Sequence, residues 1–184
     1  MEDVKLLVVV DVQNDFITGV LGTPEAQSII PNVIEKIKNW DGCIIATADN
    51  HNKEYYDRTI EGKNIPFHCS FEDTSSAIQT DVYNTLIEHP NFLKIISKST
   101  FGTTDLNDYI CNYMWRYQLL NIVEVQFIGL CTDICVLSNA IIMRASDPTL
   151  PVFVDASCCA GTTPENHQKA LDIMKLNCIE IINN

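Results

Sequence analysis

The chain has 184 residues, of which 46% are apolar and 20% are charged, a composition typical of one soluble globular domain rather than of a disordered chain. Its formal net charge of −12 at pH 7 would repel nucleic acid and anionic membrane surfaces, so we expect neither as a partner. No apolar run approaches the ~18–20 residues that a membrane-spanning helix requires.

Eight cysteines are spread along the sequence. Several lie in apolar runs, such as Cys43 and Cys178, where a thiol packs as a small hydrophobic group. The first residues, Met-Glu-Asp-Val-Lys, carry no secretory signal pattern. We therefore expect a cytoplasmic protein in a reducing environment, with most of its thiols inert.

Short apolar runs rich in β-branched residues alternate with longer amphipathic segments. Runs that are apolar throughout are typical of strands buried on both faces of a parallel sheet. In chain order the predicted elements are strand Leu6–Val10, helix Ile30–Trp40, strand Cys43–Thr47, helix Ser75–Glu88, strand Leu93–Ile96, helix Asp105–Tyr117, strand Val123–Ile128, helix Thr132–Ala145, strand Val152–Val154, helix Pro164–Leu176 and strand Ile179–Ile182.

This alternation predicts right-handed crossovers and an α/β fold, a Rossmann-like three-layer αβα sandwich around a mostly parallel sheet of about six strands. Residues 1–184 contain no repeat, low-complexity tract or linker, so we expect a single domain. The longest irregular stretch is Asn50–Thr74. Loops of that length in a compact domain are often functional.

Polar side chains follow several predicted strands. Asp11 ends the first, Asp49 and His51 follow the second, and Lys98 follows the third, while Cys135 lies just after the fourth. Ligands of open parallel sheets bind beyond the carboxyl ends of the strands. One edge of the sheet should therefore carry an acid, an acid–imidazole pair, an ammonium group and a thiol, a combination more informative than any one of them.

Cys135 has more than one interpretation. Val136 and Leu137 follow it, so the thiol could simply be a buried core group, as most cysteines in such runs are. Alternatively, a thiol in the first turn of a helix feels the positive end of the helix dipole, which lowers its pKa below the free value of ~8.5 and favours a nucleophilic thiolate. Cys131, four residues earlier, raises the possibility of a redox or metal pair, but C-x₃-C matches the commoner C-x₂-C signature poorly.

Asp11 and Lys98 each have a structural alternative. A strand-end aspartate often caps a turn, and most lysines are solvated surface residues. Beside a thiol, however, Asp11 could act as the base that takes its proton and returns it to a leaving amine. Lys98 would then stabilise the charges of both groups.

Four residues could bind a metal ion. Asp49 and His51 lie two residues apart, which places both on one face of a strand end. His68 and Glu61, from the long loop, could complete a set of carboxylates and imidazoles that suits Zn²⁺, Mn²⁺ or Fe²⁺. Both could equally be ordinary loop residues, and Cys69 is a spare soft ligand.

Together these residues lie in motifs through which the sequence resembles the isochorismatase-like cysteine hydrolases and, within them, the nicotinamidase branch. The motifs are Asp11-Val-Gln-Asn-Asp-Phe16, Thr47-Ala-Asp-Asn-His51, Pro66-Phe-His68, Lys98-Ser-Thr-Phe-Gly-Thr and Gly129-Leu-Cys-Thr-Asp-Ile-Cys-Val136. They span nearly the whole chain, and the last is the most specific. The sequence departs from the family at Phe67, where Pro is usual, at Ile65, where an aromatic residue often stands, and in a shorter segment after Lys98.

The resemblance implies a catalytic triad of Asp11, Lys98 and Cys135. It also implies an oxyanion hole formed by the backbone N–H groups of Cys131 and Cys135, with a cis peptide between Leu130 and Cys131.

The same resemblance implies one divalent metal ion, with Zn²⁺ the first choice and Mn or Fe as alternatives. Its expected ligands are Asp49, His51, His68 and, as in part of the family, Glu61. In nicotinamidases this metal holds the pyridine nitrogen and places the carboxamide over the thiol. The expected substrate-binding residues are Phe16, Ile65, Phe101 and Leu130.

The chain is therefore predicted to be a metal-dependent hydrolase of a small amide, converting nicotinamide to nicotinic acid and ammonia through a thioester in NAD salvage. Three alternatives stay open: an isochorismatase-like hydrolase of another small amide or ring substrate, an inactive binding or scaffold member, and a metal-sensing or redox protein. The apolar helix around Ile134–Met143 further predicts a homo-oligomer.

Overall fold

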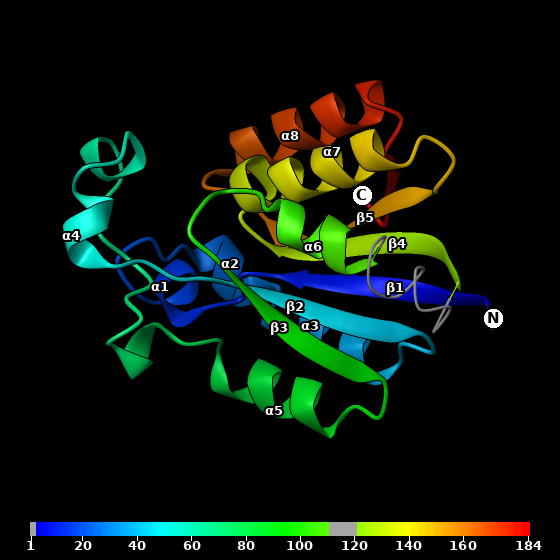
Figure 1. Ribbon diagram of the computed structural model, residues 1–184, viewed down its shortest axis with the longest axis horizontal. Coiled ribbons are helices and arrows are strands. Elements are labelled where there is room, and N and C mark those ends of the chain that lie inside the picture. Colours follow the sequence, from blue (N-terminus) through cyan, green and yellow to red (C-terminus); the bar gives the residue numbers. More distant parts are fainter. Residues whose placement is uncertain (1–2, 111–120) are drawn as a thin grey trace.

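A computed structural model describes residues 3–110 and 121–184 (Figure 1). Its middle layer is a sheet in which every pair of neighbouring strands runs parallel, in the order β3-β2-β1-β4-β5-β6. The strands are β1 (Asp3–Val10), β2 (Cys43–Asp49), β3 (Phe92–Lys98), β4 (Asn121–Leu130), β5 (Val152–Ala160) and β6 (Glu180–Ile182). The predicted three-layer α/β architecture is confirmed, and the described sheet is parallel throughout.

Helices cover both faces of the sheet (Figure 1). One face is covered by α6 (Thr104–Asp108), α7 (Leu137–Ser146) and α8 (Pro164–Leu176). The other is covered by α1 (Asn14–Ile17), α2 (Pro24–Ser28), α3 (Ile30–Lys38) and α5 (Thr80–Glu88). The remaining described helical segments are α4 (Lys53–Tyr56), the 3₁₀ turns η1 (Glu61–Lys63) and η2 (Thr74–Ser76), and the π-turn η4 (Thr132–Val136). None of the described helices is long and apolar enough to cross a membrane.

The central strand β1 explains why its sequence is a continuous apolar run. Leu6 and Val8 pack into the core beneath α7 and α8, whereas Leu7 and Val9 pack beneath α3 and α5. All four are 0–1% exposed. Full burial of each such side chain contributes roughly 1.5–3 kcal/mol, so a strand between two helical layers needs apolar residues at every position.

Four predicted helices differ from the observed ones at their boundaries. The helix expected over Ile30–Trp40 ends at Lys38. The helix expected from Ser75 begins at Thr80, because Ile78 pairs with Gln13 in a β-bridge and Gln79 caps α5 through its side chain. The helix expected over Thr132–Ala145 is divided into η4 and α7. The helix expected over Asp105–Tyr117 corresponds to α6, and residues 111–117 lie outside the described part of the chain.

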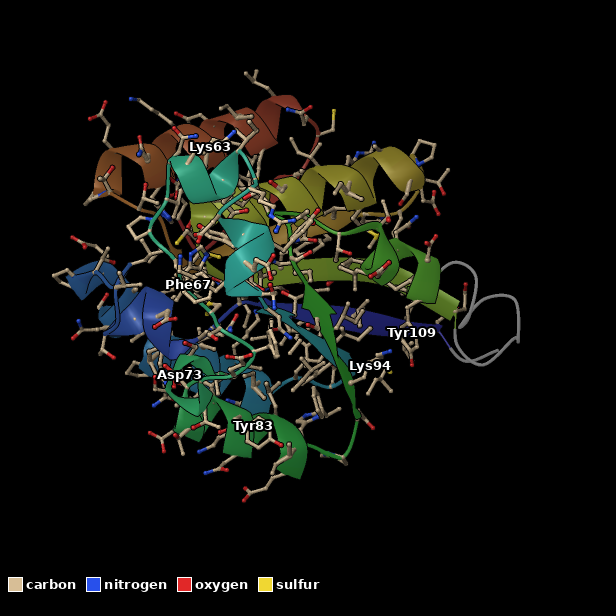
Figure 2. The ribbon with its side chains drawn as sticks, turned by 60° about the vertical axis from the view of Figure 1, so that its left-hand side comes forward. Lys63, Phe67, Asp73, Tyr83, Lys94 and Tyr109 are labelled. Carbon is tan, nitrogen blue, oxygen red and sulfur yellow. The ribbon has the colours of Figure 1, made fainter. Side chains whose placement is uncertain are left out.

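The long irregular stretch is confirmed as the segment that carries α4 and η1, which lies across the carboxyl ends of the strands (Figure 2). Two contacts fasten its far end. His51 pairs with Ser70 in a parallel β-bridge, and the backbone N–H of Cys69 donates to Asp15 Oδ2 at 2.6 Å. The loop therefore forms a fixed wall over the edge where the strands deliver their polar residues.

Candidate active site

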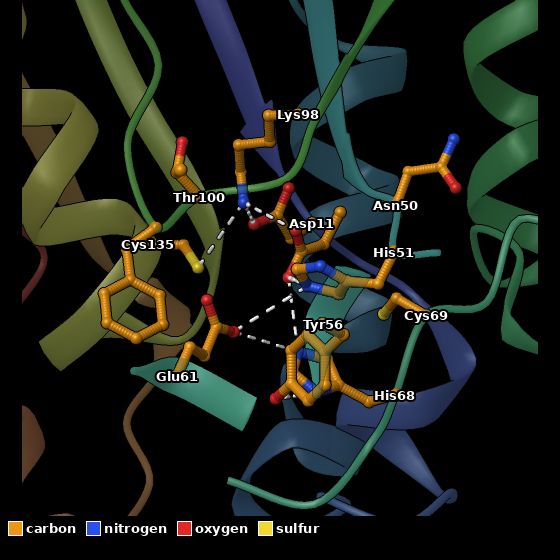
Figure 3. Close-up of polar contacts among 12 residues, drawn as sticks. Asp11, Asn50, His51, Tyr56, Glu61, His68, Cys69, Lys98, Thr100 and Cys135 are labelled. Carbon is orange, nitrogen blue, oxygen red and sulfur yellow. Dashed lines mark hydrogen bonds and ion pairs between the residues drawn. The ribbon is translucent and has the colours of Figure 1, made fainter. Parts of the chain in front are cut away.

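The carboxyl ends of the strands bring three predicted catalytic side chains into contact (Figure 3). Asp11 directly follows β1, Lys98 is the last residue of β3, and Cys135 lies in η4 after β4. Lys98 Nζ is 2.6 Å from Asp11 Oδ2 and 3.7 Å from Cys135 Sγ. All three residues are buried, at 0–5% exposure, so an ammonium group links a carboxylate to a thiol in a water-poor site.

Asp11 is held by β2 as well as by Lys98. Thr47 Oγ1 donates to Asp11 Oδ1 at 2.7 Å, and the backbone N–H of Asp11 donates to the carbonyl oxygen of Thr47 at 3.2 Å. Asp11 also has a left-handed backbone, with φ of 48°, a conformation that Asp tolerates better than most residues. Sequence reasoning assigned no role to Thr47, which positions one oxygen and leaves the other for Lys98.

Burial decides the resting protonation of the thiol. It raises the pKa of Cys135 well above its ordinary value, and the Asp11 carboxylate raises it further while Lys98 opposes them. The expected lowering of this pKa by a helix dipole is therefore wrong, because desolvation outweighs any favourable charge. The resting group is a neutral thiol that needs a base.

Asp11 and Lys98 are suited to assist the deprotonation of the Cys135 thiol. Burial raises the pKa of Asp11 above its ordinary value, although Lys98 lowers it, which makes the carboxylate a better proton acceptor than a solvated one. Burial would lower the pKa of Lys98, but Asp11, Cys135 and Asp49 together outweigh it and raise the pKa. Lys98 therefore remains a cation.

The turn that carries Cys135 depends on a close approach of two strands. Gly129 has φ of +119°, and a Cβ there would lie 2.1 Å from the carbonyl oxygen of Val10 on β1. The following Leu130–Cys131 peptide is cis, as the family resemblance implied. The backbone N–H groups of Ile134 and Val136 both donate to the carbonyl oxygen of Cys131, each at 3.1 Å, and close the π-turn.

Beside this group, Asp49, His51, Glu61 and His68 form one cluster whose ligand atoms all lie within 4.8 Å of one another (Figure 3). Nε2 of His51 and Nε2 of His68 lie 3.2 and 3.3 Å from Asp49 Oδ2, and each lies 3.7 Å from Glu61 Oε1. Among the described residues, Asp49 Oδ1, His51 Nε2 and Glu61 Oε1 are buried without a well-formed hydrogen bond. Two carboxylates and two imidazoles with unsatisfied buried atoms fit a divalent ion such as Zn²⁺, whose ligand bonds are about 2.0–2.2 Å long.

The electrostatics of the cluster also suit a cation. Burial raises the pKa of Asp49, but its close contacts with the His51 and His68 rings and the positive charge of Lys98 outweigh it and lower the pKa below its ordinary value, so this carboxylate is ionised. Burial and the Asp49 charge raise the pKa of Glu61. A bound cation would relieve this repulsion between the two carboxylates.

His68 is oriented by its outer nitrogen. Its Nδ1 lies 2.9 Å from the carbonyl oxygen of Pro66, which can only accept, so Nδ1 carries the hydrogen and Nε2 presents its lone pair to the cluster. Phe16 packs edge-on against the ring at 5.3 Å between centroids. The Pro66-Phe67-His68 motif therefore fixes the tautomer by a backbone carbonyl, which the departure at Phe67 does not affect.

Gln13 is a site residue that sequence reasoning missed. Its Nε2 donates to the carbonyl oxygens of Asp49 and Ser76, both at 3.0 Å, and its Oε1 accepts from the backbone N–H of Asp49 at 2.6 Å. The side chain is 3% exposed. Its place two residues after Asp11, just beyond the end of the same buried strand, is the signal that could have indicated this role.

A cavity of about 390 Å³ opens between the thiol and the metal cluster. Three of the predicted substrate-binding residues, Phe16, Ile65 and Phe101, line it. The prediction for Leu130 is wrong, because its side chain points into the apolar core with 0% exposure rather than into the cavity. Further wall residues that were not predicted are Leu21, Thr23, Asn64, Ile134 and Thr162.

The metal–thiol alternative does not fit the geometry. Among the described residues, the possible metal cluster contains no cysteine. Burial raises the pKa of Cys131 to about 12 and also raises that of Cys69, so neither thiol is prepared to ligate as a thiolate.

Comparison with known proteins agrees with this geometry. The isochorismatase domain family matches residues 5–184. The nicotinamidase of Saccharomyces cerevisiae is 23% identical over 222 residues, covering 97% of this chain and 99% of that protein.

Solved structures share the fold over their full length. The pyrazinamidase of Pyrococcus horikoshii in complex with zinc superposes with a TM-score of 0.75 at 26% identity, with 100% of each chain covered. The nicotinamidase/pyrazinamidase of Bacillus subtilis gives a TM-score of 0.80 at 21% identity, with 98% of this chain and 99% of that chain covered.

Proposed function

Since this chain belongs to the isochorismatase family, we propose that it is a metal-dependent cysteine amidohydrolase that converts nicotinamide to nicotinic acid and ammonia. One observation carries the proposal: the Lys98 ammonium lies 2.6 Å from Asp11 and 3.7 Å from the thiol of Cys135, and Cys135 lines a cavity that is also lined by Asp49, Glu61 and His68 of the candidate metal cluster. The similarity to a yeast nicotinamidase and to a zinc-containing pyrazinamidase supports the same substrate class.

In the first half-reaction, Asp11 takes the proton of the Cys135 thiol and the sulfur attacks the carboxamide carbon. Lys98 keeps its positive charge and stabilises the carboxylate before the transfer and the developing thiolate during it. The backbone N–H groups of Cys131 and Cys135 would hold the oxyanion of the tetrahedral intermediate. Asp11 then returns the proton to the leaving nitrogen, ammonia departs, and a thioester remains.

In the second half-reaction, Asp11 accepts a proton from water as that water attacks the thioester carbon. The carbon–sulfur bond breaks, nicotinic acid forms, and the proton returns to the sulfur. The raised pKa of the buried Asp11 serves both directions of transfer, because the group can hold a proton between steps.

Asp49, His51, Glu61 and His68 would hold the metal ion, with Zn²⁺ the first choice and Mn or Fe as alternatives. When bound, the ion supplies a Lewis-acid contact for the ring nitrogen of the substrate and so helps to orient its carboxamide. Phe16, Ile65 and Phe101 would pack against the ring.

This chemistry needs a reduced thiol, and we therefore expect the protein to work in the cytoplasm, in NAD salvage. We also propose that residues 1–184 form a single domain and that the protein is a homo-oligomer. Cys69, Cys131 and Cys135 are free thiols, as a reducing compartment requires.

The decisive experiment measures ammonia release from nicotinamide by the zinc-loaded protein, by the protein treated with a chelator, and by Cys135→Ala. We expect Cys135→Ala to lose at least about 10³-fold in kcat, because the proposed thioester forms on this sulfur. Cys178→Ala, which removes an exposed thiol, serves as the matched control and should retain the wild-type rate. Normal turnover by Cys135→Ala, or none by the zinc-loaded wild type, would contradict the proposal.

A further inference from the structure

The start of α8 is fastened to the turn that carries Cys135 by two polar pairs. His167 Nδ1 lies 2.8 Å from Thr132 Oγ1. The carboxylate of Asp133 accepts from the backbone N–H of Thr162 at 2.8 Å and from its hydroxyl at 2.5 Å. Thr162 also lines the cavity, so its pair with Asp133 joins the cavity wall to the nucleophile turn, while the His167–Thr132 pair joins α8 itself to that turn.

Thr132 occupies a sensitive position in that turn. It follows Cys131, whose backbone N–H is a proposed oxyanion donor, and it is the first residue of η4, which carries Cys135. The residue is 0% exposed, and its hydroxyl is paired with His167. A buried hydroxyl that lost this partner would have to find another, and the peptide beside it would turn in the process.

His167 is built to serve as that partner. It lies in the first turn of α8, where its backbone N–H donates to the carbonyl oxygen of Thr163 at 2.9 Å. Gly161 lets the preceding loop pass close by, since a Cβ there would lie 2.8 Å from the backbone nitrogen of His167. Burial lowers the pKa of His167, although Asp133 raises it, so a neutral ring can accept the hydrogen of Thr132 at Nδ1.

We propose that His167 is a positioning residue for the reaction: through the hydroxyl of Thr132 it fixes the orientation of the turn that supplies the nucleophile and the oxyanion donors. This inference rests on the proposed cysteine amidohydrolase function. His167 does not line the cavity and touches no reacting atom, so its effect falls on the geometry of the transition state rather than on substrate binding. Displacements well below 1 Å at such donors are enough to slow an acyl transfer.

The test compares steady-state kinetics of nicotinamide hydrolysis in His167→Ala, His167→Asn, Thr132→Val and the Thr132→Val/His167→Ala double variant. Loss of one hydrogen bond should lower kcat roughly fivefold to tenfold in His167→Ala and in Thr132→Val, with KM within about twofold of wild type. The double variant should lose no more than either single one, because both changes remove the same contact. His167→Asn should recover most of the rate, since its Oδ1 can accept where Nδ1 did.

His89→Ala is the matched control. His89 is also half-buried, and its ring contacts the carbonyl oxygen of Trp40 at 3.0 Å and accepts from the backbone N–H of Asn91 at 3.2 Å, but it lies between α5 and β3, away from the turn that carries Cys135. Its kcat should equal that of wild type. Thermal melting of every variant separates a loss of fold from a loss of rate.

Any one of three results would overturn the inference while leaving the proposed function intact: an unchanged kcat in His167→Ala, additive losses in the double variant, or a failure of His167→Asn to restore the rate. No turnover by wild type would instead count against the proposed function. In that case, the alkylation rate of Cys135 by iodoacetamide, followed at its peptide by mass spectrometry, decides the inference without a substrate. A rate at least about threefold different in His167→Ala is expected, and an equal rate would overturn it.

Discussion

Gln13 ties the end of β1 to Asp49, a proposed metal ligand, by hydrogen bonds to both the backbone N–H and the carbonyl oxygen of that residue. Gln13→Ala would remove three hydrogen bonds and leave the Asp49 backbone free to shift, because this buried amide has no neighbour to replace it. Second-layer contacts of this kind typically change metal affinity by about 10–100-fold, and we expect a loss of Zn²⁺ affinity in that range. Competition with a fluorescent chelator measures it.

Asn14→Ala provides the control for that prediction. Asn14 is the adjacent amide, and its Nδ2 donates to the carbonyl oxygen of Ser75 at 3.0 Å, one residue from the carbonyl that Gln13 contacts. Within the described part of the chain its side chain makes no hydrogen bond to Asp49, so zinc affinity should stay at the wild-type value. Equal zinc affinity in Gln13→Ala and wild type would show that Asp49 is held by its strand alone.

For individual residues, the sequence predicted the positions of the charged side chains better than it predicted the neighbouring side chains that hydrogen-bond to them. Asp11, Asp49 and Lys98 lie at the carboxyl ends of neighbouring strands, so parallel topology alone brings them to one edge. The roles of Gln13 and Thr47 depend on which backbone atoms lie opposite, which spacing does not reveal. Leu130 was misplaced for a related reason, since the turn after Gly129 directs Cys131 to the cavity and Leu130 to the core.

Among the structural elements, β4 packs closely against the backbone of β1 at Gly129, just before the turn that carries Cys135. Gly129→Ala would place a Cβ 2.1 Å from the carbonyl oxygen of Val10 in a backbone conformation that L residues avoid. We expect the free energy of unfolding to fall by roughly 3 kcal/mol or more, because relief requires β1 and β4 to separate. Urea denaturation followed by circular dichroism measures the change.

Gly102→Ala is the matched comparison, since Gly102 is the other glycine in a family-like motif. The nearest atom to its Cβ would be the terminal methyl of Ile142 at 2.7 Å, which can rotate away, and its backbone is not left-handed. We expect a loss of about 1 kcal/mol or less. A loss as large as that of Gly129→Ala would mean that crowding alone, and not backbone conformation, controls both sites.

Predicted helix boundaries match the observed ones where the sequence contains a clear capping residue. Helix α8 matches its prediction at both ends, because Thr163 caps it and Pro164 begins it. Helix α5 was predicted too long because its first residues instead pair with Gln13 across a loop, a tertiary contact that no helical periodicity can indicate. The π-turn η4 likewise has the hydrophobic spacing of a helix and differs only in its hydrogen bonds.

For the whole molecule, strand order decides where chemistry can occur. The chain runs outward from β1 through β2 to β3, then returns to the other side of β1 with β4. The crevice between the two halves lies beyond Asp11, with Asp49 and Lys98 on one side and Cys135 on the other. The triad and the metal cluster therefore share a single opening, which the loop with α4 and η1 covers (Figure 2).

From that arrangement we expect a bound metal ion to raise the stability of the fold. Asp49 and His51 come from the end of β2, whereas Glu61 and His68 come from the loop, so a bound ion would join the loop to the sheet. Zn²⁺ at about 100 times its Kd should stabilise the folded state by about 2.7 kcal/mol, which corresponds to a rise in Tm of about 5–10 °C for a protein of this size. Differential scanning calorimetry with and without a chelator measures it. His51→Ala should lose most of the rise, while Glu54→Gln, an exposed acid on the same loop, should keep it; a rise of equal size in both variants would place the zinc elsewhere.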